Sequence, residues 1–179
     1  MKYIVFGKPY INNIQKNEVI DTLRSGWIGS GPKVQKFEEK FRKYKNINYS
    51  SAVNSCTAAL HLSLNALNLK KDDEVIVPAM TFCSTVNAII HSGAKPVLAD
   101  VEYSTGNITS DTIMKKITKK TKAVVIVHLA GNPCNMKEII NVVKTNNLNL
   151  IEDCAHAIEG KYEGKHLGTF GDFGCFSFY

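Results

Sequence analysis

The chain has 179 residues, of which 44% are hydrophobic and 21% charged, a composition typical of a globular domain with a sizeable core. No uninterrupted apolar stretch approaches the roughly 18 residues that a membrane-spanning helix needs. The apolar run at the N-terminus is too short for a signal peptide. We therefore expect neither a membrane protein nor a secreted one.

The net charge of +6 raises the question of nucleic-acid binding. Arginine supplies the planar fork that recognises phosphate and guanine, yet Arg24 and Arg42 are the only arginines. The lysines gather in two small clusters, at residues 33–45 and 115–122, on or beside amphipathic segments where solvated faces explain them. We expect no nucleic-acid partner.

The cysteines give no sign of a disulfide framework or a metal site. They are five in number, form no C-x-x-C pair, and occupy positions 56, 83, 134, 154 and 175. An odd number suits a reducing compartment, and structural zinc would need closely spaced ligand pairs. We therefore expect free thiols, no bound metal and a cytoplasmic location.

The first part of the chain predicts two helices. Apolar residues recur with helical spacing over 12–24, and the glycine-rich segment 26–31 then interrupts the pattern. Pro32 suits the first position of a second helix, whose apolar face would carry Val34, Phe37, Phe41 and Tyr44.

From residue 51 onward, apolar runs alternate with helical patterns. A short apolar run at 51–53 leads into a helix at 58–67. Further strands are predicted at 74–78, 96–100, 123–128, 148–153 and 174–179. The helices between them are predicted at 81–91, 110–117 and 135–144. Strands that are apolar on both faces and separated by helices indicate an α/β fold with a mostly parallel central sheet and helices on both faces.

Ligands of open α/β sheets bind at the carboxyl ends of the strands. The segment 54–60 runs from a strand end into a helix, so its backbone N–H groups could hold an anion, with the Ser55 and Thr57 hydroxyls as further donors. A helix N-cap formed by Ser55 or Thr57 explains the same residues equally well.

Three further strand ends carry candidate ligand-binding residues. Phe82 could cover a flat ring, although packing in the core is the commoner fate of such an aromatic residue. Asp153 ends an apolar strand, where its charge needs a cationic partner such as a protonated ring nitrogen. His156 could contact the same ligand, bind a metal or be a buried imidazole, and Ser177 could donate to a phosphate.

Together these segments suit one ligand that combines a phosphate, a flat ring and a basic ring nitrogen. Pyridoxal phosphate has all three, and its chemistry needs a carboxylate beside the ring nitrogen. The glycines at 168, 171 and 174 precede a strand rather than follow one, so they do not form a dinucleotide-binding motif.

The sequence resembles the sugar aminotransferases of the DegT/DnrJ/StrS family, which are pyridoxal-phosphate enzymes of fold type I. The matching motifs occur in order along nearly the whole chain, at 25–32, 37–38, 54–60, 73–78, 81–82, 127–131, 152–157 and 176–179. The resemblance implies that residues 1–179 form the pyridoxal-phosphate-binding large domain, in incomplete form.

The resemblance also implies roles for the strand-end residues. Cys56 and Thr57 would contact the cofactor phosphate through backbone and hydroxyl groups, joined by Ser177. Phe82 would stack on the pyridine ring, and Asp153 would pair with the ring nitrogen.

Contacts beyond the phosphate and the ring nitrogen follow in the same way. His156 would lie on the side of the phenolic oxygen, and Ile28 and Gly29 would border the sugar nucleotide. The version of the motif at 155–157 is more similar to family members that aminate a nucleotide-linked 4-keto-6-deoxy sugar.

Two features depart from the family pattern. Cys56 replaces a glycine or alanine, which is tolerable if its backbone N–H alone is used. The lysine that forms the Schiff base would lie three positions beyond Tyr179, so we expect that the chain is truncated before this lysine and lacks the C-terminal small domain. No catalytic residue is then expected within the chain, and the fragment alone would be inactive.

For the complete enzyme, the resemblance implies ping-pong transfer of an amino group from glutamate or glutamine to a nucleotide-linked keto sugar, in a homodimer. Two alternatives stay open. One is a truncated, non-catalytic domain that binds the cofactor or the sugar nucleotide. The other is a pyridoxal-phosphate-dependent sugar dehydratase with histidine in place of the lysine.

Overall fold

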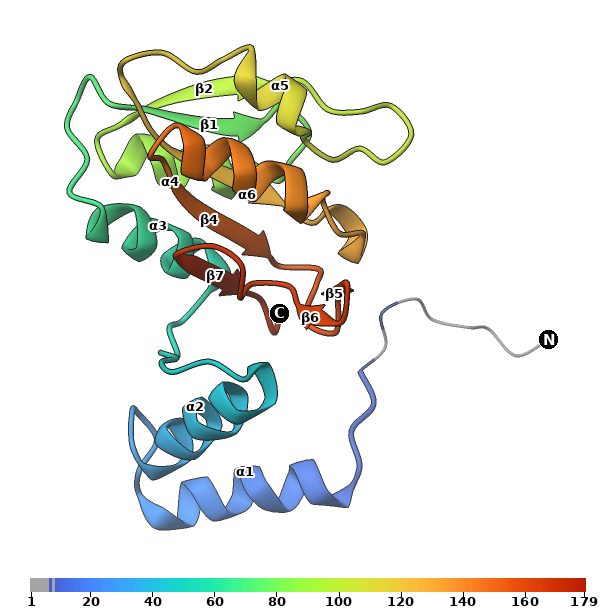
Figure 1. Cartoon of the computed structure of the whole chain (residues 1–179). Helices are drawn as coiled ribbons and strands as arrows, with labels where there is room; N and C mark the ends of the chain where they lie inside the picture. The colour runs from blue at the N-terminus through green and yellow to red at the C-terminus, as the bar shows by residue number, and fades with distance from the viewer. Residues whose placement is uncertain (1–6, 8) are drawn as a thin grey trace. The chain divides into compact units, whose positions relative to one another are not determined.

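Two helices precede a parallel sheet in the computed structural model, which describes Gly7 and residues 9–179 (Figure 1). The chain divides into two compact units, Met1–Ala52 and Val53–Tyr179. Each unit is described by itself below. The assignment of the whole chain to one large domain stays a prediction.

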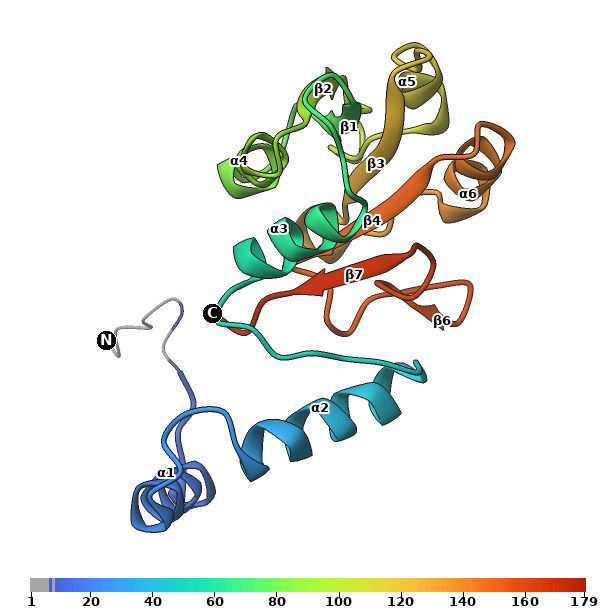
Figure 2. The same cartoon turned by 90° about the vertical axis from the view of Figure 1, so that its left-hand side faces the viewer.

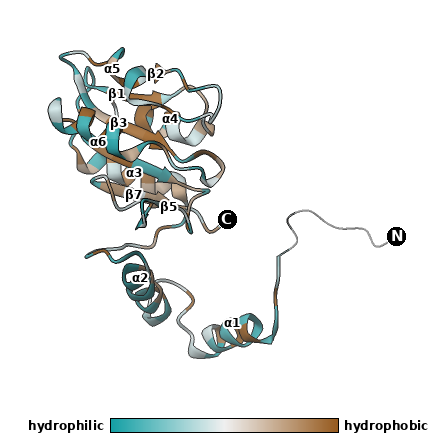
Figure 3. Ribbon diagram, turned by 45° about the vertical axis from the view of Figure 1, so that its right-hand side comes forward, coloured by the Kyte–Doolittle hydropathy of each residue, from teal (hydrophilic) through white to brown (hydrophobic). Residues whose placement is uncertain are grey.

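The first unit contains α1 (Asn13–Ser25) and α2 (Pro32–Lys45), close to the predicted bounds. A reciprocal capping box starts α1, because the Asn12 side chain accepts from the Ile14 N–H at 2.7 Å while the Gln15 side chain accepts from the Asn12 N–H at 2.9 Å. Pro32 is the first residue of α2, as predicted. Figure 3 shows that α2 is largely hydrophilic.

The second unit is built on a five-stranded sheet whose strands are all parallel, in the order β2-β1-β3-β4-β7. The predicted parallel sheet is therefore confirmed. Its strands are β1 (Glu74–Pro78), β2 (Lys95–Ala99), β3 (Thr121–Val127), β4 (Asn149–Cys154) and β7 (Phe173–Phe176). The run at 51–53 forms no strand, and β7 ends three residues earlier than predicted.

Helices cover both faces of this sheet, as the apolar character of the strands predicts (Figure 2). One face carries α3 (Cys56–Ala66) and α4 (Cys83–His91). The opposite face carries α5 (Ser110–Met114) and α6 (Met136–Thr145). None of the helices in the described part of the chain combines the length and the apolarity that crossing a bilayer requires.

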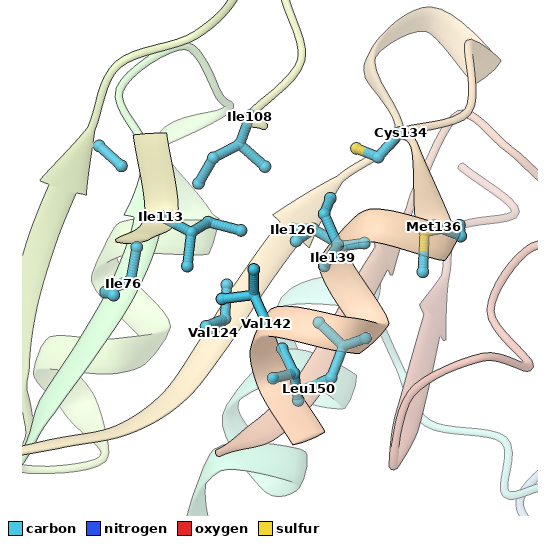
Figure 4. Close-up of a cluster of buried hydrophobic side chains, with 12 residues drawn as sticks. Ile76, Ile108, Ile113, Val124, Ile126, Cys134, Met136, Ile139, Val142 and Leu150 are labelled. Atoms are coloured by element: carbon cyan, nitrogen blue, oxygen red, sulfur yellow. The ribbon is translucent and has the colours of Figure 1, made fainter. Parts of the chain in front are cut away.

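Alternate residues of each strand enter separate cores on the two faces. In β3, Val124 and Ile126 pack under α5 and α6, whereas Ala123 and Val125 pack under α3 and α4. Figure 4 shows the first of these cores, with labelled members Ile76, Ile108, Ile113, Val124, Ile126, Cys134, Met136, Ile139, Val142 and Leu150. Burial on both faces explains why the strands read as continuous apolar runs.

Two short elements lack a counterpart among the predictions. A hairpin joins β5 (Lys161–Tyr162) to β6 (Lys165–His166) through Glu163 and Gly164, both with positive φ. A 3-10 turn, η1 (Leu129–Gly131), follows β3. Both are too short to produce a hydrophobic period.

Because β3 is the middle strand of the sheet, shortening a buried side chain in it should strongly lower the stability of the fold. Ile126→Ala should lower the free energy of unfolding by about 2–5 kcal/mol, because it leaves a cavity in a fully buried core. Leu98→Ala, at a 52% exposed position of edge strand β2, is the control and should cost less than about 1 kcal/mol. Urea unfolding followed by circular dichroism measures both, and equal losses would contradict the assignment of Ile126 to the core.

Candidate functional site

Several loops and helix starts meet at the carboxyl edge of the sheet. The strands are parallel and in register, with Val127 of β3 beside Asp153 of β4 and Asp153 beside Cys175 of β7. Their carboxyl ends therefore lie along one edge, the place where open α/β sheets bind ligands. The segments that follow β3, β4 and β7 contain η1, His156 and Ser177 respectively.

Asp153 is the central polar group on the α3 and α4 side of this edge. Its side chain is on the same face of β4 as Ile151, which packs under these two helices. The Thr85 hydroxyl of α4 donates to Oδ2 at 2.9 Å. The Ala155 N–H donates to Oδ1 at 3.1 Å, and the Cys56 thiol of α3 contacts the same oxygen at 3.9 Å. Three segments thus converge on one carboxylate.

The charge of Asp153 is poorly compensated. The residue is only 4% exposed, and burial raises its pKa, while hydrogen bonds from Ala155 and Thr85 and the nearby His156 act in the opposite direction. In the described part of the chain, no lysine or arginine forms an ion pair with it. A buried carboxylate with only weak cationic neighbours suits a positively charged ligand atom.

The N-terminus of α3 lies beside Asp153, because Cys56 is the first residue of that helix. Ser55 is the N-cap and accepts from the Ala58 N–H at 3.1 Å, so the N-cap alternative is correct for Ser55. The first four N–H groups of a helix have no partner inside the helix, and the Ser55 side chain satisfies one of them. The N–H groups of Cys56 and Thr57 are also among these four. The half-buried Cys56 and the exposed Thr57 therefore stand at the positive helix end, where an anion is favoured.

The thiol of Cys56 is directed toward Asp153. Burial and the neighbouring carboxylate raise the pKa of this thiol, so it stays protonated and can donate. The Cys56 side chain is therefore a neighbour of Asp153. From the sequence, a role was expected only for the backbone N–H of Cys56.

Ser177 follows the last strand at the same edge. A contact of 3.4 Å between Ser63 Oγ and Cys175 Sγ joins α3 to β7, two residues before Ser177. Ser177 is half-buried, and its hydroxyl oxygen accepts from the Tyr179 N–H at 3.3 Å. The structure therefore brings Cys56, Asp153 and Ser177 to one edge of the sheet.

Phe82 is the N-cap residue of α4 and is 73% exposed. Packing in the core, the commoner fate expected from sequence, is therefore wrong for this residue. An exposed aromatic ring between the end of β1 and the start of α4 has a face available to a planar ligand.

His156 lies in the loop after β4 and is exposed, so the buried-imidazole alternative is wrong. Its backbone is closely packed against η1, where Gly131 has a φ of +82°. A Cβ added to Gly131 would lie 2.9 Å from the His156 carbonyl oxygen. Glycine at 131 therefore permits the approach of two loops that follow neighbouring strands.

Ile28 and Gly29 lie in the first unit, in the loop between α1 and α2, and both are exposed. Their contact with a sugar nucleotide stays a prediction.

A buried hydrogen-bond network on the opposite face of β4 has no counterpart in the sequence-based predictions. Glu152 is fully buried, and each of its carboxylate oxygens accepts two hydrogen bonds. Oε1 accepts from the N–H groups of Phe170 and Gly171 at 2.7 and 2.8 Å. Oε2 accepts from the Gly168 N–H at 2.8 Å and from His128 Nε2 at 3.0 Å. The only visible signal in the sequence is a charged residue within an apolar strand.

The hydrogen bonds of His128 identify its tautomer. Nδ1 accepts from the Cys134 N–H at 3.2 Å, so Nε2 carries the proton and donates to Glu152. Ligand atoms of His128, Glu152 and Cys154 lie within 4.8 Å of one another, a spacing that also suits a metal ion. Because both ring nitrogens and both carboxylate oxygens are already hydrogen-bonded, this group is better explained as a structural network.

Comparison with families of known proteins matches residues 9–179 to the DegT/DnrJ/EryC1/StrS aminotransferase family. GDP-perosamine synthase of Escherichia coli O157:H7 is 46% identical over 180 residues, which cover 100% of this chain and 50% of that protein. The spore coat polysaccharide biosynthesis protein SpsC of Bacillus subtilis (strain 168) is 44% identical over 177 residues, with 99% and 46% covered. The chain spans about half the length of the curated relatives it matches.

Solved structures show the same fold. A protein of Streptococcus pneumoniae described as a sugar aminotransferase, in its PLP form, is 37% identical with a TM-score of 0.94. The match covers 98% of this chain and 49% of that one. The PMP form of the same protein matches with a TM-score of 0.95. The expected fold class is confirmed.

The network around Glu152 predicts a strong requirement for a carboxylate. Glu152→Gln should lower the free energy of unfolding by about 2–5 kcal/mol, because the amide NH₂ would face N–H donors in a buried site. Urea unfolding measures the loss. Glu102→Gln is the matched control, since Glu102 is exposed and its carboxylate bonds to Thr105. A similar small loss in both variants would refute the role of Glu152.

The raised pKa of Asp153 predicts a stability cost for its charge in the cofactor-free protein. Because the folded pKa lies above the unfolded one, this cost is present above the folded pKa and disappears as the pH falls through it. Asp153→Asn should therefore raise the Tm at pH 8, and the gain should shrink on acidification through the folded pKa. Differential scanning calorimetry from pH 8 to pH 4 tests this. The exposed Asp72→Asn is the control, and a gain that grows toward low pH would contradict the prediction.

Proposed function

This chain belongs to the DegT/DnrJ/EryC1/StrS aminotransferase family, and we propose that it is the cofactor-binding part of a pyridoxal-phosphate-dependent nucleotide-sugar aminotransferase. The observation that carries the proposal is the buried Asp153 carboxylate, which lies at the ligand-binding edge of the sheet and has no lysine or arginine partner among the residues that the structure describes. The protonated ring nitrogen of the cofactor would supply the missing positive charge.

The residues at this edge fit the remaining parts of the cofactor. The N–H groups of Cys56 and Thr57, at the positive end of α3, would bind its phosphate. The Thr57 and Ser177 hydroxyls would donate to the same phosphate. The exposed ring of Phe82 would cover one face of the pyridine, and His156 would approach the phenolic oxygen.

When bound, pyridoxal phosphate supplies the electron sink that lets an amino group leave an amino acid and join a keto compound. Asp153 would hold the proton on the ring nitrogen, which keeps that sink strong. Phe82 and the helix start at Cys56 would orient the ring and shield it from water. These are positioning and electrostatic roles, in agreement with a site built from a rigid sheet edge.

We propose glutamate or glutamine as the amino donor and a nucleotide-linked 4-keto-6-deoxy sugar as the acceptor. The GDP-perosamine synthase among the relatives supports a nucleotide-linked sugar. The exposed loop that contains Ile28 and Gly29 would border that nucleotide sugar.

The complete protein would contain more than the chain described. The matched relatives are about twice as long, and we propose that a cofactor-binding lysine lies five residues after Ser177, followed by a small C-terminal domain. We further propose a cytoplasmic homodimer.

Reductive trapping on the full-length protein tests the proposal. After incubation with pyridoxal phosphate and reduction with borohydride, peptide mapping should find a pyridoxyl group on one lysine, in the peptide that follows Phe-Ser-Phe-Tyr. The peptide with the label reports the cofactor site without reference to any sugar. A sample reduced without pyridoxal phosphate is the control, and a label spread over surface lysines would refute a dedicated site.

The same protein then tests the reaction class. With glutamate and GDP-, UDP- or dTDP-linked 4-keto-6-deoxy sugars, mass spectrometry should detect a glutamate-dependent amino sugar. A sugar that has lost a hydroxyl group without gaining nitrogen would instead indicate a dehydratase. Absence of both the trapped lysine and turnover would leave a non-catalytic binding domain.

A further inference from the structure

Thr85 of α4 and Thr81, the residue before the cap of this helix, form a hydrogen-bonded chain that ends on Asp153. Thr85 is fully buried, and its hydroxyl donates to Asp153 Oδ2 at 2.9 Å. The hydroxyls of Thr85 and Thr81 lie 2.8 Å apart. Thr81 is half-buried, at the carboxyl edge of the sheet just before Phe82.

The direction of each hydrogen bond in this chain follows from Asp153. An ionised carboxylate only accepts, so the single hydroxyl proton of Thr85 is committed to Oδ2. The Thr85 oxygen then accepts from Thr81, whose hydroxyl must be the donor in the 2.8 Å contact. Aligned hydrogen bonds of this kind strengthen one another, and all of them favour the ionised carboxylate.

The two carboxylate oxygens differ in how fully they are used. Oδ1 accepts from the Ala155 N–H and contacts the Cys56 thiol. Oδ2 accepts from Thr85 alone among the groups in the described part of the chain. Since each oxygen has two lone pairs, Oδ2 keeps one direction for a further donor. An N–H donor that approaches Asp153 along this direction would share Oδ2 with Thr85.

We propose that Thr85, supported by Thr81, is a positioning residue that aims Oδ2 of Asp153 at the ring nitrogen of the cofactor and holds this carboxylate ionised. This inference rests on the proposed function, since it assumes that the cofactor pairs with Asp153. It concerns a residue that contacts the carboxylate and not the cofactor itself. The strength of the bond between ring and carboxylate then depends on a side chain in α4.

A pair of ligands separates this role from a purely structural one. Pyridoxamine phosphate contains the ring nitrogen, and its 1-deaza analogue has CH in the same position. In the full-length protein, Thr85→Val should weaken binding of pyridoxamine phosphate about tenfold, the effect of losing one hydrogen bond to a charged group. Binding of the deaza analogue should be unchanged, because it makes no bond to Asp153. Isothermal titration calorimetry measures both dissociation constants.

Three further variants serve as controls. Thr85→Ser keeps the hydroxyl and should restore the difference between the two ligands. Thr81→Val removes only the outer donor and should produce a smaller loss, of about threefold, for pyridoxamine phosphate alone. Thr112→Val alters a half-buried threonine that bonds within the cap of α5 and should change neither constant.

Each outcome decides between the alternatives. Selective weakening of pyridoxamine phosphate by Thr85→Val supports the inference. Equal weakening of both ligands, or no weakening, overturns it while the proposed function stands. If Thr85→Val does not fold, Thr81→Val decides by the same comparison. Wild-type protein that binds the two ligands equally would overturn the pairing with Asp153, and wild-type protein that binds neither would overturn the proposed function and the inference together.

Discussion

The structure depends on how β4 presents two adjacent carboxylates to opposite faces of the sheet. Glu152 faces the α5 and α6 side and is fully buried, while Asp153 faces the α3 and α4 side. The period of two along a strand forces this separation. One carboxylate is thereby available to organise the surrounding loops, and the other is available to a ligand.

Glu152 helps to organise the carboxyl edge because its partners come from two segments that are distant along the chain. Three backbone N–H groups of the loop 168–171 and the His128 ring end on its two oxygens. That loop leads directly into β7 and hence to Ser177, while His128 leads into η1, whose Gly131 packs against His156. The network therefore ties together the loops that follow β3 and precede β7, near Asp153, and support of this kind favours a preorganised binding site.

The sequence predicted the sheet well and the hydrogen bonding poorly, for one physical reason. Strands and helices follow from local periods, so the parallel sheet, its two helical layers and the position of Asp153 at a strand end were all accessible. The partners of the polar groups are distant along the chain: Thr85 lies 68 residues from Asp153, and His128 lies 24 residues from Glu152. No local pattern marks such pairs. The residues alone left two alternatives open for Phe82, because the exposure of an aromatic residue depends on the fold around it, and the structure excludes core packing.

The two carboxylates also differ in how their burial is compensated, and that difference connects stability with binding. Glu152 accepts four hydrogen bonds, three of them from rigid backbone groups, so its site is complete. Asp153 accepts from one hydroxyl and one N–H and contacts a thiol, and burial still raises its pKa. A ligand that brings a positive charge to Oδ2 removes this remaining cost. Such a ligand binds only the folded chain. The interaction that holds the ligand in place therefore also stabilises the fold.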